Sequence, residues 1–289
     1  MQLIMVGMDF SPQADRALRR ATLLARATGA RLCLVHACDR EEPQPPATLS
    51  EAKERLAGMA RALDAEGLDA DTACLAGSPE AALPPAALAH GADLLVLGPH
   101  RQQPLKDLFV SATAGRILRR SEVPVLLSLG VPAGPWQRIL VASDLSDSSA
   151  HALALVGREA ALHSGELRLF HAFEPLPHGF MTTSGMTVQE RQDEIAALRR
   201  KAEKGLAAQA EAAGLGAAER QVQPLLHGPA ESILQAAADM RADLVVVGTR
   251  GASGLERFIL GSVADAVLRQ ASMDVLAVPP GATRGSQPG

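Results

Sequence analysis

The chain of 289 residues contains no tyrosine, and aromatic residues make up only 2% of it. Proteins that bind single-stranded nucleic acid usually stack bases on aromatic side chains, and this sequence offers few. A formal net charge of −4 and a pI near 6.1 also leave no basic footprint for a phosphate backbone. We therefore expect no nucleic-acid partner, and we expect cores built from Ala, Leu and Val.

Long apolar runs are missing too, since none approaches the roughly 20 residues that a membrane-spanning helix needs. The first residues, "MQLIMVGMDFS", lack a basic region and include Asp9, which favours a strand over a secretion signal. Cysteine is scarce and odd in number, and the C-x4-C spacing of Cys33 and Cys38 matches no common zinc or redox pattern. We predict a cytoplasmic protein without a membrane span, whose thiols are buried or idle.

Motifs for several catalytic classes are also absent. The chain has no G-x4-G-K-S/T, no G-x-S-x-G and no H-E-x-x-H. These absences exclude a P-loop lysine, a nucleophile elbow and the common zinc-protease helix.

What the sequence does have is an internal repeat. Four segments of the first half match segments of the second half, at an offset of about 135 residues and, after an extra stretch of about 15, of about 150. The matched pairs are 3–21 with 139–157, 32–39 with 167–174, 92–98 with 242–248, and 123–129 with 273–279. Two domains, 1–130 and 137–280, follow from this repeat, and the Pro/Gly-rich "GVPAGPW" (130–136) joins them.

Each copy alternates short apolar runs with helical patterns. Ser11-Pro12 and Ser146 are typical helix starts, because serine caps the first turn and proline fits its first position. Pro84-Pro85 is expected to interrupt the helix before the fourth strand of the first copy. Five strands per copy, separated by helices, predict an α/β fold with a parallel sheet covered on both faces. The strands are expected near 3–8, 32–37, 71–75, 93–98 and 123–129, and near 139–143, 167–172, 220–226, 243–248 and 274–279.

Ligands of such open sheets bind at the carboxyl ends of the strands, where the strand order reverses. If the order is 3-2-1-4-5, Asp144 after strand one and Gly248 after strand four face one crevice. Gly248 begins "GTRGASGLERFILGS" (248–262), in which Gly248 and Gly251 can adopt positive φ and bring backbone amides to a phosphate. Gly261-Ser262 opens the last helix, whose amides and dipole favour an anion.

Plainer roles are open for the same residues. Two or three glycines alone are compatible with a simple turn, and Asp144 with a local cap ahead of Ser146. Arg250 either adds a cation beside the phosphates or points to solvent. The complete spacing G-x2-G-x9-G-S, together with the facing aspartate, favours a binding site.

That spacing, behind a strand and ending at a helix start, resembles the nucleotide-binding motif of the universal stress proteins, and "VASDLSDSSAHAL" (141–153) resembles their first strand and helix. The likeness covers nearly the whole chain, taken twice, as in a tandem member. It implies two Rossmann-like domains of the adenine nucleotide alpha hydrolase type, each an open five-stranded sheet. It also implies an adenine nucleotide, ATP in the binding members, with ADP or AMP as alternatives and Mg²⁺ left open.

The resemblance assigns roles by position. Asp144 would contact the ribose or the adenine, and the backbone near Ala142 and Ala172 would border the base, although some binding members have proline at Ala142. The residues that would line the ribose and phosphates are Val247, Gly248, Gly251, Gly261, Ser262 and Val263, with Arg250 nearby.

The first copy departs from this motif. It keeps Asp9 and Gly98, but Arg101 stands where the second copy has Gly251, and Ser111-Ala112 replaces Gly261-Ser262. An arginine is poorly suited to positive φ and competes for the phosphate space. We predict a degenerate first site; the alternative is an anion held by the side chains of Arg101, Lys106 or His100.

The crevice offers one acid and no second acid to hold Mg²⁺ or to orient water. We therefore predict a nucleotide-responsive binding protein that is not an enzyme, with a non-binding scaffold and a slow ATPase as alternatives. A protein partner and a homodimer stay open. His36 and His171, at matching strand ends, are expected to pack or hydrogen-bond. The segment 175–187 is expected to be a loop, and 191–214 a long helix with a solvated charged face.

Overall fold

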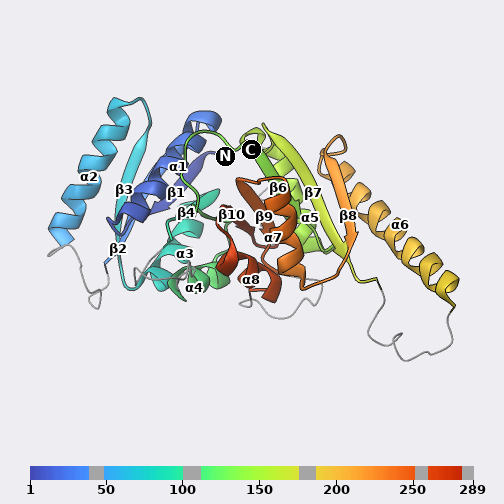
Figure 1. Cartoon of the computed structure of the whole chain (residues 1–289). Coiled ribbons are helices and arrows are strands. Elements are labelled where there is room, and N and C mark those ends of the chain that lie inside the picture. The colour runs from blue at the N-terminus through green and yellow to red at the C-terminus, as the bar shows by residue number, and fades with distance from the viewer. Residues whose placement is uncertain (39–48, 100–111, 176–186, 251–259, 282–289) are drawn as a thin grey trace.

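The computed structural model describes residues 1–38, 49–99, 112–175, 187–250 and 260–281, and in this part of the chain ten strands form one continuous sheet (Figure 1). The strands are β1 (Leu3–Gly7), β2 (Arg31–Cys38), β3 (Ala70–Ala76), β4 (Leu94–Leu97), β5 (Val125–Leu127), β6 (Arg138–Ala142), β7 (Glu166–Phe173), β8 (Glu219–Pro224), β9 (Leu244–Gly248) and β10 (Asp274–Val278). The helices are α1 (Pro12–Thr28), α2 (Leu49–Ala65), α3 (Pro79–Ala89), α4 (Ala112–Arg120), α5 (Asp147–Arg158), α6 (Val188–Ala212), α7 (Pro229–Asp239) and α8 (Ser262–Gln270), with a 3₁₀ turn at Ala160–Leu162.

The sheet runs β3-β2-β1-β4-β5-β10-β9-β6-β7-β8. Each copy therefore has the predicted order 3-2-1-4-5 with parallel neighbours. The prediction of two separate open sheets is wrong at one edge, because β5 and β10 pair antiparallel, with Leu126 opposite Leu276. This pairing joins the five strands of each copy into a single sheet. We call the β5–β10 contact between the two copies the seam.

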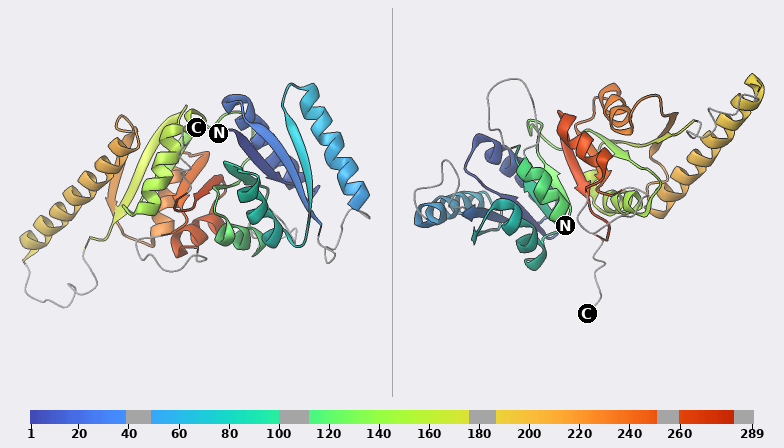
Figure 2. Two further views of the ribbon diagram at one scale, coloured as in Figure 1. Left: turned by 180° about the vertical axis from the view of Figure 1, so that it is seen from behind. Right: turned by 90° about the horizontal axis from the view of Figure 1, so that it is seen from below.

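Helices cover both faces of this sheet (Figure 2). Apolar side chains of α1, α2, α5 and α6 pack on one face, and those of α3, α4, α7 and α8 pack on the other. Each of the two apolar layers continues across the seam without a break. Alternate residues of the buried strands, such as Val245 and Val246, point into opposite layers, as the two-residue period of a strand requires.

Both predicted helix starts are confirmed. The Ser11 hydroxyl accepts a hydrogen bond from the Ala14 amide, and the Ser146 hydroxyl accepts one from the Ser149 amide. Gly29 ends α1 with φ at 73°, a left-handed conformation that glycine adopts without strain. The local sequence thus fixes where the helices behind strands β1 and β6 begin.

The predicted interruption at Pro84-Pro85 is wrong, because α3 runs through both prolines. A proline in a helix leaves the carbonyl four residues earlier without its usual donor. For Pro84 that carbonyl belongs to Glu80, and it accepts a hydrogen bond from the Arg120 guanidinium, Nη1 to O, at 3.2 Å. A neighbouring helix, α4, therefore supplies the donor that Pro84 removes.

A buried polar cluster crosses the seam. Asp274, fully buried at the start of β10, lies with Oδ2 2.8 Å from the Nε of Arg20 on α1. The Nε–H does not point along the line to the carboxylate, so charge attraction rather than a hydrogen bond carries this contact. Asp274 also accepts hydrogen bonds from Trp136 Nε1 and the Gly130 amide, both at 2.9 Å. The linker between the copies is thereby pinned to both of them.

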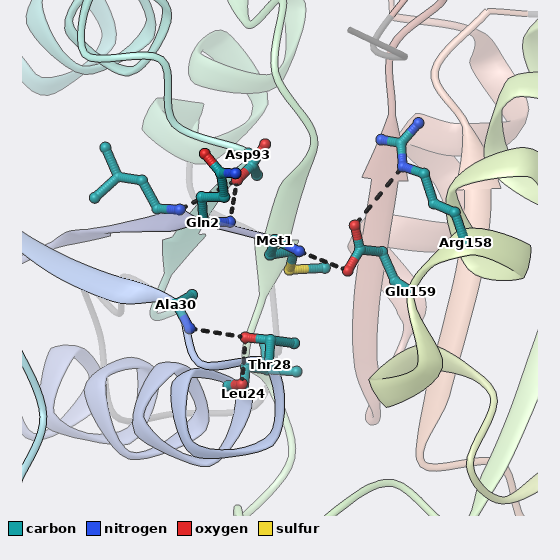
Figure 3. A network of polar contacts seen from close by, with 9 residues as sticks. Met1, Gln2, Leu24, Thr28, Ala30, Asp93, Arg158 and Glu159 are labelled. Atoms are coloured by element: carbon teal, nitrogen blue, oxygen red, sulfur yellow. Dashed lines mark hydrogen bonds and ion pairs between the residues drawn. The ribbon is translucent and has the colours of Figure 1, made fainter. Parts of the chain in front are cut away.

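A second polar contact joins the copies next to the first strand (Figure 3). The amino group of Met1 lies 2.8 Å from the carboxylate of Glu159, which also lies 3.7 Å from Arg158. On the other side of Met1, the Gln2 and Leu3 amides donate to Asp93. These contacts hold the beginning of β1 against both β4 and the second copy.

Among the helices of the described residues, none combines the length and apolar character that crossing a membrane requires.

Candidate functional site

The ends of β6 and β9 lie side by side at the carboxyl edge of the second half-sheet. The two strands pair in parallel, with Val141 opposite Val246. Ala142 ends β6 and Gly248 ends β9, so the segments that follow them leave the sheet next to each other. The Arg250 amide donates to the Ser148 hydroxyl in the first turn of α5 at 3.3 Å, which ties the two segments together. The ends of strands one and four are therefore neighbours, as predicted, and the crevice between them stays a prediction.

Asp144 lies on the loop between β6 and α5 and is exposed. Its Oδ1 accepts hydrogen bonds from the amide and the hydroxyl of Ser146, so the predicted alternative of a local turn former is confirmed. Asp9 makes the same two bonds with Ser11 in the first copy. Both bonds of Asp144 go to one oxygen, which leaves the second oxygen of an exposed carboxylate able to accept from a ligand.

Gly248 needs a different explanation from the predicted one. Its φ is not positive, and a Cβ placed on it would lie 2.8 Å from Ser148 Oγ and 3.1 Å from the Ser148 carbonyl oxygen. The end of β9 packs against the first turn of α5 so closely that a side chain does not fit. Gly98 is squeezed in the same way against Gln13 of α1. This glycine therefore serves strand–helix packing in both copies, which is why the first copy keeps it.

The last helix begins where the sequence predicts. Gly261 is the N-cap of α8, and its amide donates to the Thr249 carbonyl at 2.8 Å, which brings the helix start back to the end of β9. Gly261 supplies no capping side chain, and no side-chain cap bond is formed at this end among the described residues. Ser262, the first helical residue, is exposed and Val263 is half-buried. Gly251 and the rest of 251–259 lie outside the described residues.

The three apolar members of the predicted site lie on adjacent strand ends. Ala142 and Val247 are buried at the ends of β6 and β9, and Ala172 is half-buried near the end of β7. All three point to the sheet face that carries α7 and α8. The predicted base-side residues Ala142 and Ala172, and Val247 of the predicted ribose and phosphate side, thus share one face with α8.

The first copy has different side chains at the corresponding strand ends. Gly7 stands where the second copy has Ala142, and a Cβ on Gly7 would lie 2.7 Å from Leu97 Cδ2 and 3.4 Å from Leu83 Cδ1. The leucine at 97 replaces the smaller Val247 of the second copy. Arg101, Lys106, His100, Ser111 and the side chain of Ala112 lie outside the described residues, so the alternative anion site stays a prediction.

A contact that the sequence did not predict holds the Asp144 loop against α6. Ser143 Oγ donates to Gln209 Oε1 at 2.6 Å, and Gln209 Nε2 donates to the Ser146 carbonyl at 3.1 Å. Leu145, at φ 63°, lies over Gly205, where a Cβ would come within 2.9 Å of its Cδ1. A glycine in the middle of a long helical pattern was the available signal, because such a glycine often marks a close approach.

The matching histidines act as predicted. His36 Nδ1 lies 2.7 Å from the Met8 carbonyl oxygen, and His171 Nδ1 lies 2.8 Å from the Ser143 carbonyl oxygen, both buried. Each ring therefore fixes the residue that follows the first strand of its copy. Within the described residues no group of three or more His, Cys, Asp or Glu side chains is arranged to hold a metal ion.

Comparison with known proteins decides the family. The model of the universal stress protein family matches residues 1–128 and again residues 135–279. The chain belongs to the universal stress protein family. It is a tandem member, since the family unit occurs twice. A universal stress protein of Thermus aquaticus is 38% identical over 144 residues, which are 50% of this chain and 98% of that relative.

Solved structures show the same two-domain fold over almost the whole chain. A functionally unknown Pseudomonas aeruginosa protein, PA1789, matches with a TM-score of 0.71 at 22% identity, covering 97% of this chain and 93% of its own. A universal stress protein of Archaeoglobus fulgidus matches with a TM-score of 0.68 at 18% identity, covering 96% and 98%. At these identities the likeness concerns the fold alone.

Proposed function

We propose that the second copy of this universal stress protein binds an adenine nucleotide, ATP in the first place, and that the protein acts as a nucleotide-responsive regulator. The observation that carries the proposal is the meeting of the exposed Asp144 loop with the start of α8 at the ends of two neighbouring strands. Two hydrogen bonds connect these parts through the segment after β9: the Arg250 amide donates to the Ser148 hydroxyl, and the Gly261 amide donates to the Thr249 carbonyl.

The start of α8 supplies the anion side of the proposed site. The first amides of a helix lack partners within the helix, and the helix dipole adds a partial positive charge there. Gly261 brings no side chain to compete for these amides, and the Ser262 hydroxyl is exposed beside them. A phosphate is the ligand group that such an end favours.

Asp144 supplies the sugar side. A ribose offers two hydroxyl donors, and the carboxylate oxygen that Ser146 leaves unused is a suitable acceptor for one of them. Ala142, Val247 and Ala172 are small enough to leave the adjoining strand ends accessible to a flat base. We place the nucleotide only in the second copy, because the first copy has Arg101 in place of Gly251 and Ser111-Ala112 in place of Gly261-Ser262.

We infer binding without dedicated catalysis. Among the described residues proposed for the site, Asp144 is the one carboxylate, whereas phosphoryl transfer generally uses further groups to hold the metal and to position the attacking water. Where Mg²⁺ accompanies the nucleotide, Asp144 is the carboxylate of the proposed site that would bind it. The nucleotide would then act by favouring one of two states of the protein, to the extent that it binds them with different affinity.

The test is thermal stabilisation by ATP combined with titration calorimetry. A ligand at about 100 times its dissociation constant stabilises by about 2.7 kcal/mol, a shift on the order of 5 °C for a domain of this size. Gly251→Arg, which introduces the residue that the first copy has, should abolish both signals. Gly58→Arg is the matched control, because it adds the same side chain to a half-buried position of α2 where a Cβ would meet nothing closer than the end of the Arg61 side chain, at 4.0 Å. Stabilisation that survives Gly251→Arg would place the nucleotide elsewhere.

The continuous sheet favours a second candidate, an interaction scaffold in which the two copies form a built-in pseudo-dimer. The β5–β10 pairing and the buried Asp274 cluster make the copies one body without any ligand. Absence of ATP binding at millimolar concentration, with the wild-type chain fully folded, would favour this candidate over the first.

A further inference from the structure

The longest helix carries a surface that its own domain does not use. Helix α6 lies at the outer end of the molecule beside β8 (Figures 1 and 2). One side of it buries Ala202, Leu206 and Ala210 against the sheet. The opposite side is exposed from the first turn of the helix past its middle. At 1.5 Å per residue the helix is about 37 Å long, so this side is an extended flat ridge.

The charges on the exposed side are arranged around one small residue, Ala197. Seven, four and three residues before it stand acids, and three, four and seven residues after it stand bases. The spacing of about three to four residues puts all of them on one face. They are Glu190, Asp193 and Glu194 before the centre, and Arg200, Lys201 and Lys204 after it, all exposed.

Such a pattern is complementary to itself when reversed. In a second copy of the helix lying antiparallel with Ala197 on Ala197, every acid meets a base: Glu190 faces Lys204, Asp193 faces Lys201, and Glu194 faces Arg200. Twofold symmetry repeats each pair, as an interface between identical chains requires. The alanine at the crossing lets the helix axes approach to the usual 8–10 Å.

The helix dipole by itself favours acids at the start of a helix and bases at its end. The dipole does not require the acids and the bases to lie at equal sequence distances from one central residue, as they do around Ala197. Among the described residues none of these six charges forms an ion pair within the chain: the ion pair on this helix joins Arg199 to Glu203, which lie off the ridge. Asp193 accepts one hydrogen bond, from the Gln189 side-chain amide at 3.0 Å, and keeps its charge available. Glu190 also accepts from the Thr187 amide and hydroxyl, and a carboxylate retains further acceptor capacity.

We propose that two copies of this chain associate through the ridge of α6, helix against helix and antiparallel. Exposed ion pairs are individually weak and are screened by salt. The dimer is therefore a weak one that forms at low ionic strength and dissociates as salt is added. It does not depend on nucleotide, so its test is run without ATP and is separate from that of the proposed function.

The experiment is sedimentation velocity on the full chain at about 100 µM. Wild type should sediment as a concentration-dependent monomer–dimer mixture at about 50 mM salt, with a dissociation constant at least about tenfold higher at about 500 mM, where screening is much shorter in range. Asp193→Lys/Glu194→Lys and Arg200→Glu/Lys201→Glu should each be monomeric, because both reversals make like charges meet. An equimolar mixture of the two variants should dimerise again.

Lys53→Glu/Arg61→Glu on the exposed side of α2 is the matched control, and it should self-associate like wild type. Circular dichroism checks that each variant is folded. A wild-type chain that is monomeric at low salt overturns the proposal. So does a dimer that persists in the two reversal variants, or a mixture of these variants that stays monomeric.

Discussion

Arg20 and Asp274, 254 positions apart in the sequence, form a buried ion pair across the seam between the two copies, Nε to Oδ2, at 2.8 Å. The Arg20 guanidinium also lies over the Trp136 ring, 4.6 Å from its centre, and donates to the Gly134 carbonyl at 2.7 Å. One side chain of the first copy thereby contacts the second copy and the linker at once.

Asp274→Ala should destabilise the whole chain by about 3–5 kcal/mol, because it leaves the Arg20 charge buried without its partner. Chemical denaturation measures this loss. The double variant with Arg20→Ala should lose less than the sum of the two single variants, since residues in one ionic network are coupled. Additive losses would mean that the two side chains act independently and that the seam is held by strand pairing alone.

Gly248→Ala should cost about 1–3 kcal/mol, since the new Cβ meets the Ser148 backbone and hydroxyl and forces the first turn of α5 away. The melting temperature reports this change. Gly58→Ala is the contrasting variant: a Cβ at this half-buried position of α2 meets only the end of the Arg61 side chain, at an ordinary contact distance of 4.0 Å, so the variant should be stabilised by about 0.5–1 kcal/mol. A neutral Gly248→Ala would show that the strand end has room, and would restore the phosphate as the reason for this glycine.

Gln209→Ala should remove both hydrogen bonds that tie α6 to the Asp144 loop and cost about 1–2 kcal/mol. If the proposed nucleotide site is correct, the dissociation constant of ATP should rise by up to about tenfold, the equivalent of 1.4 kcal/mol. Titration calorimetry measures the dissociation constant of ATP for this variant and for its control. Gln235→Ala on α7 is the control, because its side chain bonds only to exposed Asp239, one turn away. An unchanged affinity in a destabilised Gln209→Ala would limit the contact to a structural role.

Acid should loosen the start of α6. Hydrogen bonds from the Thr187 backbone amide, and then from its hydroxyl, lower the pKa of Glu190. A carboxyl whose folded pKa is lowered stabilises the fold above its ordinary pKa, and this contribution disappears as the pH falls through the lowered value. Protection of the first α6 amides from hydrogen exchange should therefore exceed that of Glu190→Gln above about pH 5, and the difference should vanish towards pH 3. A difference that does not depend on pH would rule out the charge as its cause.

The parts of the fold that local sequence determines were predictable. Ser11, Ser146 and Gly29 mark helix ends by their own chemistry, and the buried strands read as short apolar runs. The order of strands within each copy followed from the family resemblance, and the structure has it. For the candidate site, the neighbouring ends of β6 and β9 followed from the same order, and the roles of all the site residues towards a nucleotide stay predictions.

The features that could not be predicted from the sequence depend on contacts between residues that lie far apart in the chain. The Glu80 carbonyl that Pro84 leaves without its usual donor accepts instead from Arg120, 36 residues after Pro84. Gly248 is explained by Ser148, and Gly205 by Leu145, and neither contact leaves a periodic pattern. The β5–β10 pairing is likewise invisible, because three-residue β5 has no feature that distinguishes a free edge from a paired one.

The antiparallel join of β5 to β10 has a consequence for how the protein responds to dilution. Two separate subunits joined at such an edge would come apart when scarce, because their association depends on how often they meet. Here the linker keeps the two edges permanently at high local concentration. The ten-stranded assembly should therefore persist at nanomolar levels in a cell, whatever amount of the protein is made.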